Sequence, residues 1–121
     1  MAKDAYYFKH DSNARTDPKI KALINKYGIE GYGRFWIVIE VLRESARYKL
    51  EDKKYLWEAL AEQMKCEVKE VKQFIKDCSD EFELFVQDNG FFYSASLLKR
   101  MTELDAIKEK RREAAFKRWE T

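Results

Sequence analysis

The chain has 121 residues, of which 45% are hydrophobic and 15% aromatic, so it can bury the core of one globular domain but is too short for two. It contains no run of about 18 apolar residues and no apolar N-terminal stretch typical of a signal peptide, which excludes a membrane span and predicts a cytoplasmic protein. The net charge is only +2, with +3 in residues 1–26, +3 in residues 99–121 and −4 between them, so attraction to phosphates should come from the ends.

The N-terminal stretch interleaves aromatic and cationic side chains. We expect an extended arm that packs its aromatics on the core, and the alternative is a segment that holds a single nucleic-acid strand. The residues concerned are Tyr6, Tyr7, Phe8, Lys9, His10 and Arg15. No Cys, His or carboxylate cluster has metal-ligand spacing, so His10 is interpreted as a surface residue.

A short helix over residues 18–27 is predicted from the residues at its two ends. Asp17 can cap it, Pro18 suits the first helical position, and Gly28 ends it.

The next helix, residues 29–45, is apolar nearly all round, which is typical of a helix enclosed by its neighbours. We expect it to be the central helix of the fold, with Gly31 and Gly33 allowing a close crossing at its start. Glu40 is the single polar residue in its apolar part and the one candidate for a raised pKa, although pairing with a nearby arginine is the commoner explanation.

A short strand at residues 48–50 should lead into two amphipathic helices that only Lys65 and Cys66 separate. The first is predicted to bury Leu56, Trp57, Leu60, Ala61 and Met64, and the second Val68, Val71, Phe74, Ile75 and Cys78. The pair has the shape of a helix-turn-helix, which either reads DNA with its second helix or only builds a core.

A β-hairpin is predicted around Asn89 and Gly90, because Asn-Gly between β-prone segments favours a tight turn with positive φ at both central residues. A final helix should begin near Ser96 and project from the body after Ile107, held by helix propensity and ion pairs. The fold class is therefore mainly α with a small hairpin: a winged helix-turn-helix with an added N-terminal helix and a long C-terminal helix. Residues 1–98 form the winged-helix domain with its arm, and 99–121 form a basic helix leading to a linker.

Three stretches carry a resemblance to a known family: YYFKHDSNARTDPKIKALINKYGIEGYGRFWIVIEVL, LFVQDNGFFYSASLLKRM and the basic tail ending in KRW. They resemble the N-terminal winged-helix domain of phage and prophage replisome organisers, which are related to DnaD-type primosomal proteins. The resemblance implies a non-enzymatic role in replication initiation, with DNA binding, self-association or both, and with a helicase or its loader as partner. It also implies that the 121 residues can be the front part of a longer protein.

Two groups of residues are candidates for binding nucleic acid. The second helix of the helix-turn-helix offers a contact stripe of Lys69, Lys72, Gln73 and Lys76, although residues 67–77 have zero net charge and a solvated face is the alternative. The tail offers Lys108, Lys110, Arg111, Arg112, Lys117 and Arg118, and its alternative role is a solubilising linker. Phe116 and Trp119 favour a binding role, because they can stack on bases or dock on a partner.

The sequence contains no phosphate loop, nucleophile elbow or histidine pair, so we expect no catalytic residue, metal or cofactor. Cys66 and Cys78 fall at buried-side positions and are interpreted as reduced packing residues. A stripe of Leu97, Met101 and Leu104 predicts a symmetric dimer through the terminal elements. The expected function is a DNA-binding and assembly module of a phage-type replication initiator, and the alternatives are a structural oligomerisation domain without DNA binding and a small transcriptional regulator.

Overall fold

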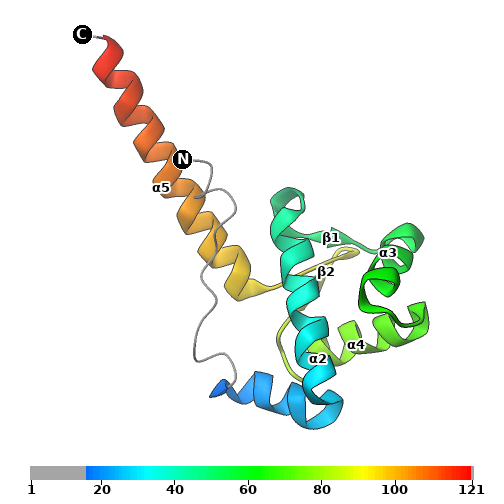
Figure 1. The fold of residues 1–121 in the computed structure, drawn as a ribbon. Helices are drawn as coiled ribbons and strands as arrows, with labels where there is room; N and C mark the ends of the chain where they lie inside the picture. Colours follow the sequence, from blue (N-terminus) through cyan, green and yellow to red (C-terminus); the bar gives the residue numbers. More distant parts are fainter. Residues whose placement is uncertain (1–15, 121) are drawn as a thin grey trace.

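The computed structural model describes residues 16–120 (Figure 1). In chain order the elements are helix α2 (Pro18–Glu44), the 3-10 turn η2 (Ala46–Tyr48), strand β1 (Leu50–Glu51), helices α3 (Lys54–Met64) and α4 (Val68–Asp80), strands β2 (Val86–Asp88) and β3 (Phe91–Tyr93), and helix α5 (Ala95–Glu120). This order confirms the predicted mainly α winged helix-turn-helix with a small antiparallel sheet. The predicted arm, with Tyr6, Tyr7, Phe8, Lys9, His10 and Arg15, lies outside the described residues.

Helix α2 consists of two arms that meet at Gly28. The backbone N–H of Lys19 donates to the Asp17 carboxylate at 2.8 Å, and Pro18 takes the first position, so the predicted helix start is confirmed. Gly28 has φ 74° and ψ −168°, a conformation that only glycine adopts readily. The chain therefore changes direction there, as predicted, and resumes a helix at once, so that the two arms lie at an angle (Figure 1).

The two glycines of the second arm differ in their surroundings. A Cβ added to Gly31 would lie 2.2 Å from the Cβ of Tyr27, so the two arms of α2 approach each other closely there. No atom of the described residues lies within 4 Å of a Cβ on Gly33, and its predicted part in a close crossing is wrong. Glu40 is exposed and faces solvent, so the arm is not apolar all round and holds no buried carboxylate at that position.

Helices α3 and α4 form the predicted helix-turn-helix. All five predicted core residues of α3 are buried, as are Val71, Phe74, Ile75 and Cys78 of α4, whereas Val68 at its start is only half-buried. The turn is made by Lys65, which adopts the left-handed conformation (φ 58°, ψ 44°) and lets the N–H of Cys66 donate to the carbonyl of Ala61 at 3.1 Å.

The sheet has the strand order β1-β3-β2, and both neighbouring pairs are antiparallel. Asn89 (φ 51°) and Gly90 (φ 78°) form the turn of the predicted hairpin. The first strand begins at Leu50 rather than at residue 48, because Tyr48 has φ 60° and belongs to η2. An extended strand requires negative φ, so the chain becomes extended only after this turn.

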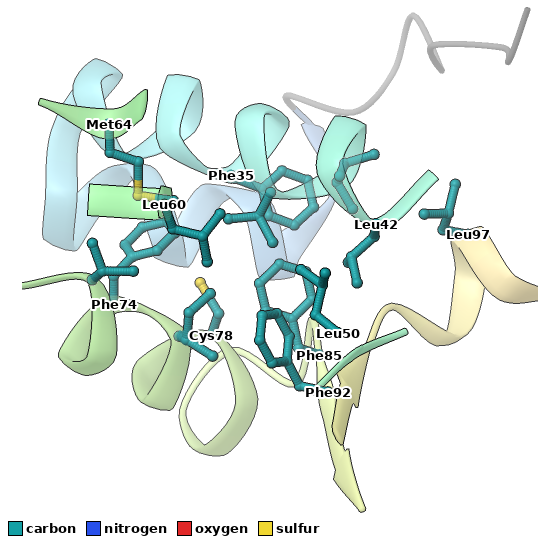
Figure 2. Close-up of a cluster of buried hydrophobic side chains, with 14 of the residues drawn as sticks. Phe35, Leu42, Leu50, Leu60, Met64, Phe74, Cys78, Phe85, Phe92 and Leu97 are labelled. Carbon is teal, nitrogen blue, oxygen red and sulfur yellow. The ribbon is translucent and has the colours of Figure 1, made fainter. Parts of the chain in front are cut away.

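The core gathers side chains from every helix and from the sheet (Figure 2). Phe85 stacks on Phe35 with 5.6 Å between ring centroids, and Phe92 of β3 stacks on Trp57 of α3 at 5.7 Å. Cys78 is fully buried and burial raises the pKa of its thiol, while Cys66 is half-buried. Both cysteines are free, so the described residues contain no disulfide, and Cys78 packs in the core as predicted.

Helix α5 begins on the body and ends far from it (Figure 1). Leu97 and Met101 are buried, Leu104 is half-buried, and Ile107 is exposed, as the predicted stripe requires. The hydroxyl of Tyr48 donates to Asp105 at 2.8 Å and attaches the helix to η2. Beyond this hydrogen bond the helix projects without cover from the described body.

Candidate nucleic-acid interface

The projecting part of α5, residues 108–119, is called here the basic extension. It carries all six cations predicted for the tail, and apart from the half-buried Lys108 its residues are exposed. It contains six basic and two acidic side chains, which makes it the most cationic segment of the chain. Arg112 forms an exposed ion pair with Glu109 at 3.4 Å, one helical turn away.

The local sequence explains why this segment remains helical without burial. It contains no Gly, Pro or β-branched residue, and Lys, Arg, Glu and Ala all have high helix propensity. Lys117 and Arg118 lie in the last turn, where their charges interact favourably with the helix dipole. The extension is therefore a helical rod of positive charge rather than a coil.

The cations are distributed around this rod. Arg111 and Arg118 are seven residues apart, and so are Lys110 and Lys117, so the two members of each pair lie nearly in line and about 10 Å apart along the helix. Charge on several sides of a helix does not select one groove geometry, because it attracts phosphates from any direction. Such an arrangement suits binding that is strong at low salt and weak in sequence preference.

Two large aromatic side chains are exposed among these cations. Phe116 is 66% exposed and Trp119 is 88% exposed. A shallow hollow surrounds the Phe116 ring and is lined by Glu109, Arg112, Glu113, Phe116 and Lys117. An apolar ring bordered by charged groups of both signs is a feature of binding surfaces rather than of cores.

The contact stripe predicted on α4 lies on one exposed face. Its members are Lys69, Lys72, Gln73 and Lys76, at the spacing of one helix side. The ammonium of Lys72 lies 5.9 Å from the centroid of the Trp57 ring, which is a cation–π distance. The side-chain amide of Gln73 donates to Asp77 at 2.9 Å within the same helix, so this amide is engaged in the fold. The contact stripe thus offers three lysines and a glutamine whose amide already donates a hydrogen bond within the fold.

Carboxylates surround this lysine row. Glu67 occupies the N-cap position of α4 without a side-chain capping hydrogen bond and is exposed. Glu70 in the first turn of the helix lies 3.8 Å from Arg34 of α2. The turn of the hairpin carries Asp88 and no cation between residues 86 and 91. A hollow between the hairpin and α3 is lined by Asp52 and Asp88 among others. The helix-turn-helix face is therefore of mixed charge, in contrast to the basic extension.

A polar cluster that the sequence did not predict fixes α4 against the first arm of α2. The Tyr27 hydroxyl donates to Asp77, Gln73 donates to the other oxygen of that carboxylate, and Lys26 lies 3.3 Å from Asp77 and 2.7 Å from Glu81. Burial raises the pKa of the Asp77 carboxyl, but the hydrogen bonds outweigh this effect and hold the pKa below its ordinary value. The cluster sets the position of α4 and uses Gln73 for this purpose.

The described residues show no arrangement with an obvious chemical activity. Within residues 16–120, no group of three or more His, Cys, Asp and Glu side chains has the geometry to hold a metal ion. None of the helices in this part of the chain combines the length and apolar character needed to cross a membrane. What the geometry does offer is an exposed cationic helix that projects from a body containing a helix-turn-helix (Figure 1).

The comparisons with known proteins give one match. The model of the domain family described as Lin1244/Lin1753-like, N-terminal, matches residues 7–97. No curated protein and no solved structure matches the chain. The matched range includes the helix-turn-helix and the hairpin and ends at the third residue of α5, so the basic extension lies beyond it.

Proposed function

Since the chain belongs to the Lin1244/Lin1753-like N-terminal domain family, a family of unknown function, we propose from its own surface that it is a non-enzymatic DNA-binding and assembly module. The resemblance of its sequence to replisome organisers and DnaD-like proteins extends this proposal to a phage-type replication initiator. A helicase or its loader is then a protein partner.

The observation that carries the proposal is the basic extension. A helix that holds six cations against two carboxylates away from the body is poorly explained by folding, because its side chains add nothing to the core. Each cation that contacts a phosphate releases a condensed counterion, and this release drives binding at low salt. The extension therefore supplies most of the affinity, and the lysine row of α4 adds to it.

The mixed charge of the helix-turn-helix supports weak sequence preference. Base reading needs polar side chains in the first turns of the recognition helix that are available to base edges. Here the first turn presents Glu67 and Glu70, and the Gln73 amide is already hydrogen-bonded. This makes a sequence-specific transcriptional regulator a poorer explanation than a module that recognises the phosphate backbone.

A second candidate function is assembly without DNA. The exposed Ile107, Phe116 and Trp119 favour it, because a second copy of α5 would cover them. Leu97 and Met101 are already covered by the body, so a symmetric dimer would rely on the outer half of the helix. Light scattering at high concentration tests this candidate, and a monomer mass would remove it.

Fluorescence anisotropy with labelled DNA at several salt concentrations tests the main proposal. The first variant replaces five cations of the extension, Lys110, Arg111, Arg112, Lys117 and Arg118, with alanine, which retains helix propensity. If each contacts one phosphate, the slope of log affinity against log salt should decrease by about 0.7–0.9 per residue, or about 4 in all. The second variant, Lys69→Ala with Lys72→Ala and Lys76→Ala, should lose less affinity.

A matched control changes the net charge of the extension in the opposite direction. Glu109→Gln with Glu113→Gln removes the two carboxylates of the extension and should strengthen binding. If the α4 variant loses binding while the extension variant keeps it, α4 is the recognition helix and the ranking of the two surfaces is wrong. If the unchanged chain binds no DNA even in dilute salt, the proposal fails and assembly without DNA is the better explanation.

A further inference from the structure

We propose that the basic extension binds single-stranded nucleic acid in preference to duplex, with Phe116 and Trp119 stacking on unpaired bases. This inference rests on the proposed function and adds the strand state that the extension selects.

The two aromatic rings differ from the aromatics of the core. Phe35, Trp57 and Phe92 each pack on a second ring inside the core. Phe116 and Trp119, the two aromatic residues of α5, are in contrast 66% and 88% exposed. Rings with this exposure contribute little to the stability of the fold. They are instead available to a ligand with a flat apolar face.

Helical spacing places the rings on the same side as two cations. Lys108, Arg112 and Phe116 follow one another at intervals of four residues, and Trp119 lies three residues further, so all four occupy one strip of the helix surface. Two cations at the inner end are thus followed by two aromatic rings at the outer end. A single strand lying along this strip meets cations for its phosphates and rings for its bases.

Duplex DNA cannot use the rings in this way. Its base faces are covered by their neighbours in the stack, and only base edges are open in the grooves. Unpaired bases expose their faces, and stacking on an aromatic side chain then strengthens binding by about 10-fold per base, without a requirement for a particular base. The cations attract both kinds of nucleic acid, whereas the rings favour only the single strand.

Charge favours a nucleic acid over a second copy of the chain as the ligand. The extension has six basic and two acidic side chains, so two extensions packed through the same strip would bring like charges together. The Glu109 carboxylate is engaged by Arg112 of its own helix at 3.4 Å and offers little compensation to a partner helix. A polyanion neutralises this charge and covers the rings at the same time.

The test compares a 20-nucleotide single strand with the duplex of the same sequence, both labelled and both titrated with the whole chain. The unchanged chain should bind the single strand at least 10-fold more tightly. Phe116→Leu with Trp119→Leu keeps apolar side chains of similar helix propensity but removes the flat faces. It should lose the preference while keeping duplex affinity within about threefold, because all cations remain.

A matched variant retains the flat faces. Phe116→Tyr with Trp119→Phe should keep the single-strand preference. Trp119 also provides a direct measurement, because Trp57 is buried and Trp36 is half-buried, so that quenching by an added single strand should come from Trp119. Trp119→Phe should remove most of that quenching.

The possible results separate the two proposals. If the unchanged chain binds neither nucleic acid, the proposed function fails and this inference fails with it. If it binds both equally, or if the leucine variant keeps the preference, the single-strand inference is overturned while the proposed function stands. If the leucine variant instead lowers the mass measured by light scattering and leaves binding unchanged, the rings belong to an interface between copies.

Discussion

Two alanine substitutions only two residues apart, Gly31→Ala and Gly33→Ala, should change the free energy of unfolding in opposite directions. In an ordinary helix, each should be stabilising by about 1 kcal/mol, because alanine loses less conformational entropy on folding than glycine. A Cβ on Gly33 meets no described atom within 4 Å, so this gain should be realised there. With about 4 °C per kcal/mol for a domain of this size, the melting temperature of Gly33→Ala should rise by about 4 °C.

At Gly31 the same methyl group has no space. It would lie 2.2 Å from the Cβ of Tyr27, whereas carbon atoms in contact are separated by about 3.5–4.0 Å. Since a Cβ cannot rotate away, the two arms of α2 must move apart. That movement carries Tyr27 away from Phe74, with which it makes an edge-to-face contact at 5.1 Å, and from Asp77.

The magnitude follows from the terms involved. Overpacking costs about 1–3 kcal/mol, and weakening a hydrogen bond to a buried carboxylate costs about 1.5–3 kcal/mol more, against a propensity gain of about 1 kcal/mol. The net loss should be about 1.5–5 kcal/mol, which corresponds to a melting temperature lower by about 6–20 °C. Thermal and urea unfolding, followed by circular dichroism, measure both variants. Equal melting temperatures for the two variants would refute the close approach of the two arms at Gly31.

Three further predictions concern the turns and the polar cluster. Lys65→Gly should raise the free energy of unfolding in urea by about 1 kcal/mol, because Lys65 has φ 58° and glycine adopts this conformation without strain; a loss of stability would contradict the left-handed turn. Gly90→Val should lower the free energy of unfolding by about 1–2 kcal/mol, and with it the melting temperature, because Gly90 has φ 78°, which a β-branched residue tolerates poorly. An unchanged melting temperature would mean that the hairpin turn is built differently. The Asp77 carboxyl has a lowered pKa in the fold, so its contribution is present above the ordinary pKa of about 3.9 and is lost as pH falls through the folded value. Asp77→Asn should therefore be less stable at pH 7 but lose less stability between pH 5 and about 2, as urea titrations at each pH would show; parallel pH profiles would exclude Asp77 as the group responsible.

The helix-turn-helix and the hairpin were predictable because their patterns are local. The apolar residues of α3 recur at helical spacing and all face the core, and Asn89-Gly90 determines its own turn through backbone conformation. The basic extension was predictable for the same reason, since charge and helix propensity are properties of neighbouring residues.

The features that were missed depend on residues far apart in the chain. Tyr27 and Asp77 are 50 positions apart, and nothing in either segment indicates the other. The sequence does not reveal that pairing, so it indicates Gln73 as a contact residue, although the Gln73 amide donates a hydrogen bond to Asp77. The strand near residue 48 was displaced because Tyr48 takes a positive φ and reaches Asp105, 57 positions later. Propensity indicates what a residue favours alone, and these tertiary contacts outweigh it.

The hydrogen bond between Tyr48 and Asp105 attaches α5 to the body and acts as the pivot about which the outer part of the helix can tilt. From Asp105 to Trp119 the helix extends about 21 Å, so a tilt of about 10° at the pivot displaces the tip by nearly 4 Å. One phenol hydroxyl, held by a turn that two non-glycine residues with positive φ support, thus helps the buried Leu97 and Met101 to set where the outer end of the helix points. The direction of α5 therefore depends on the hydrogen bond between Tyr48 and Asp105 on the body. A ligand bound at the outer end of the helix would not touch this contact.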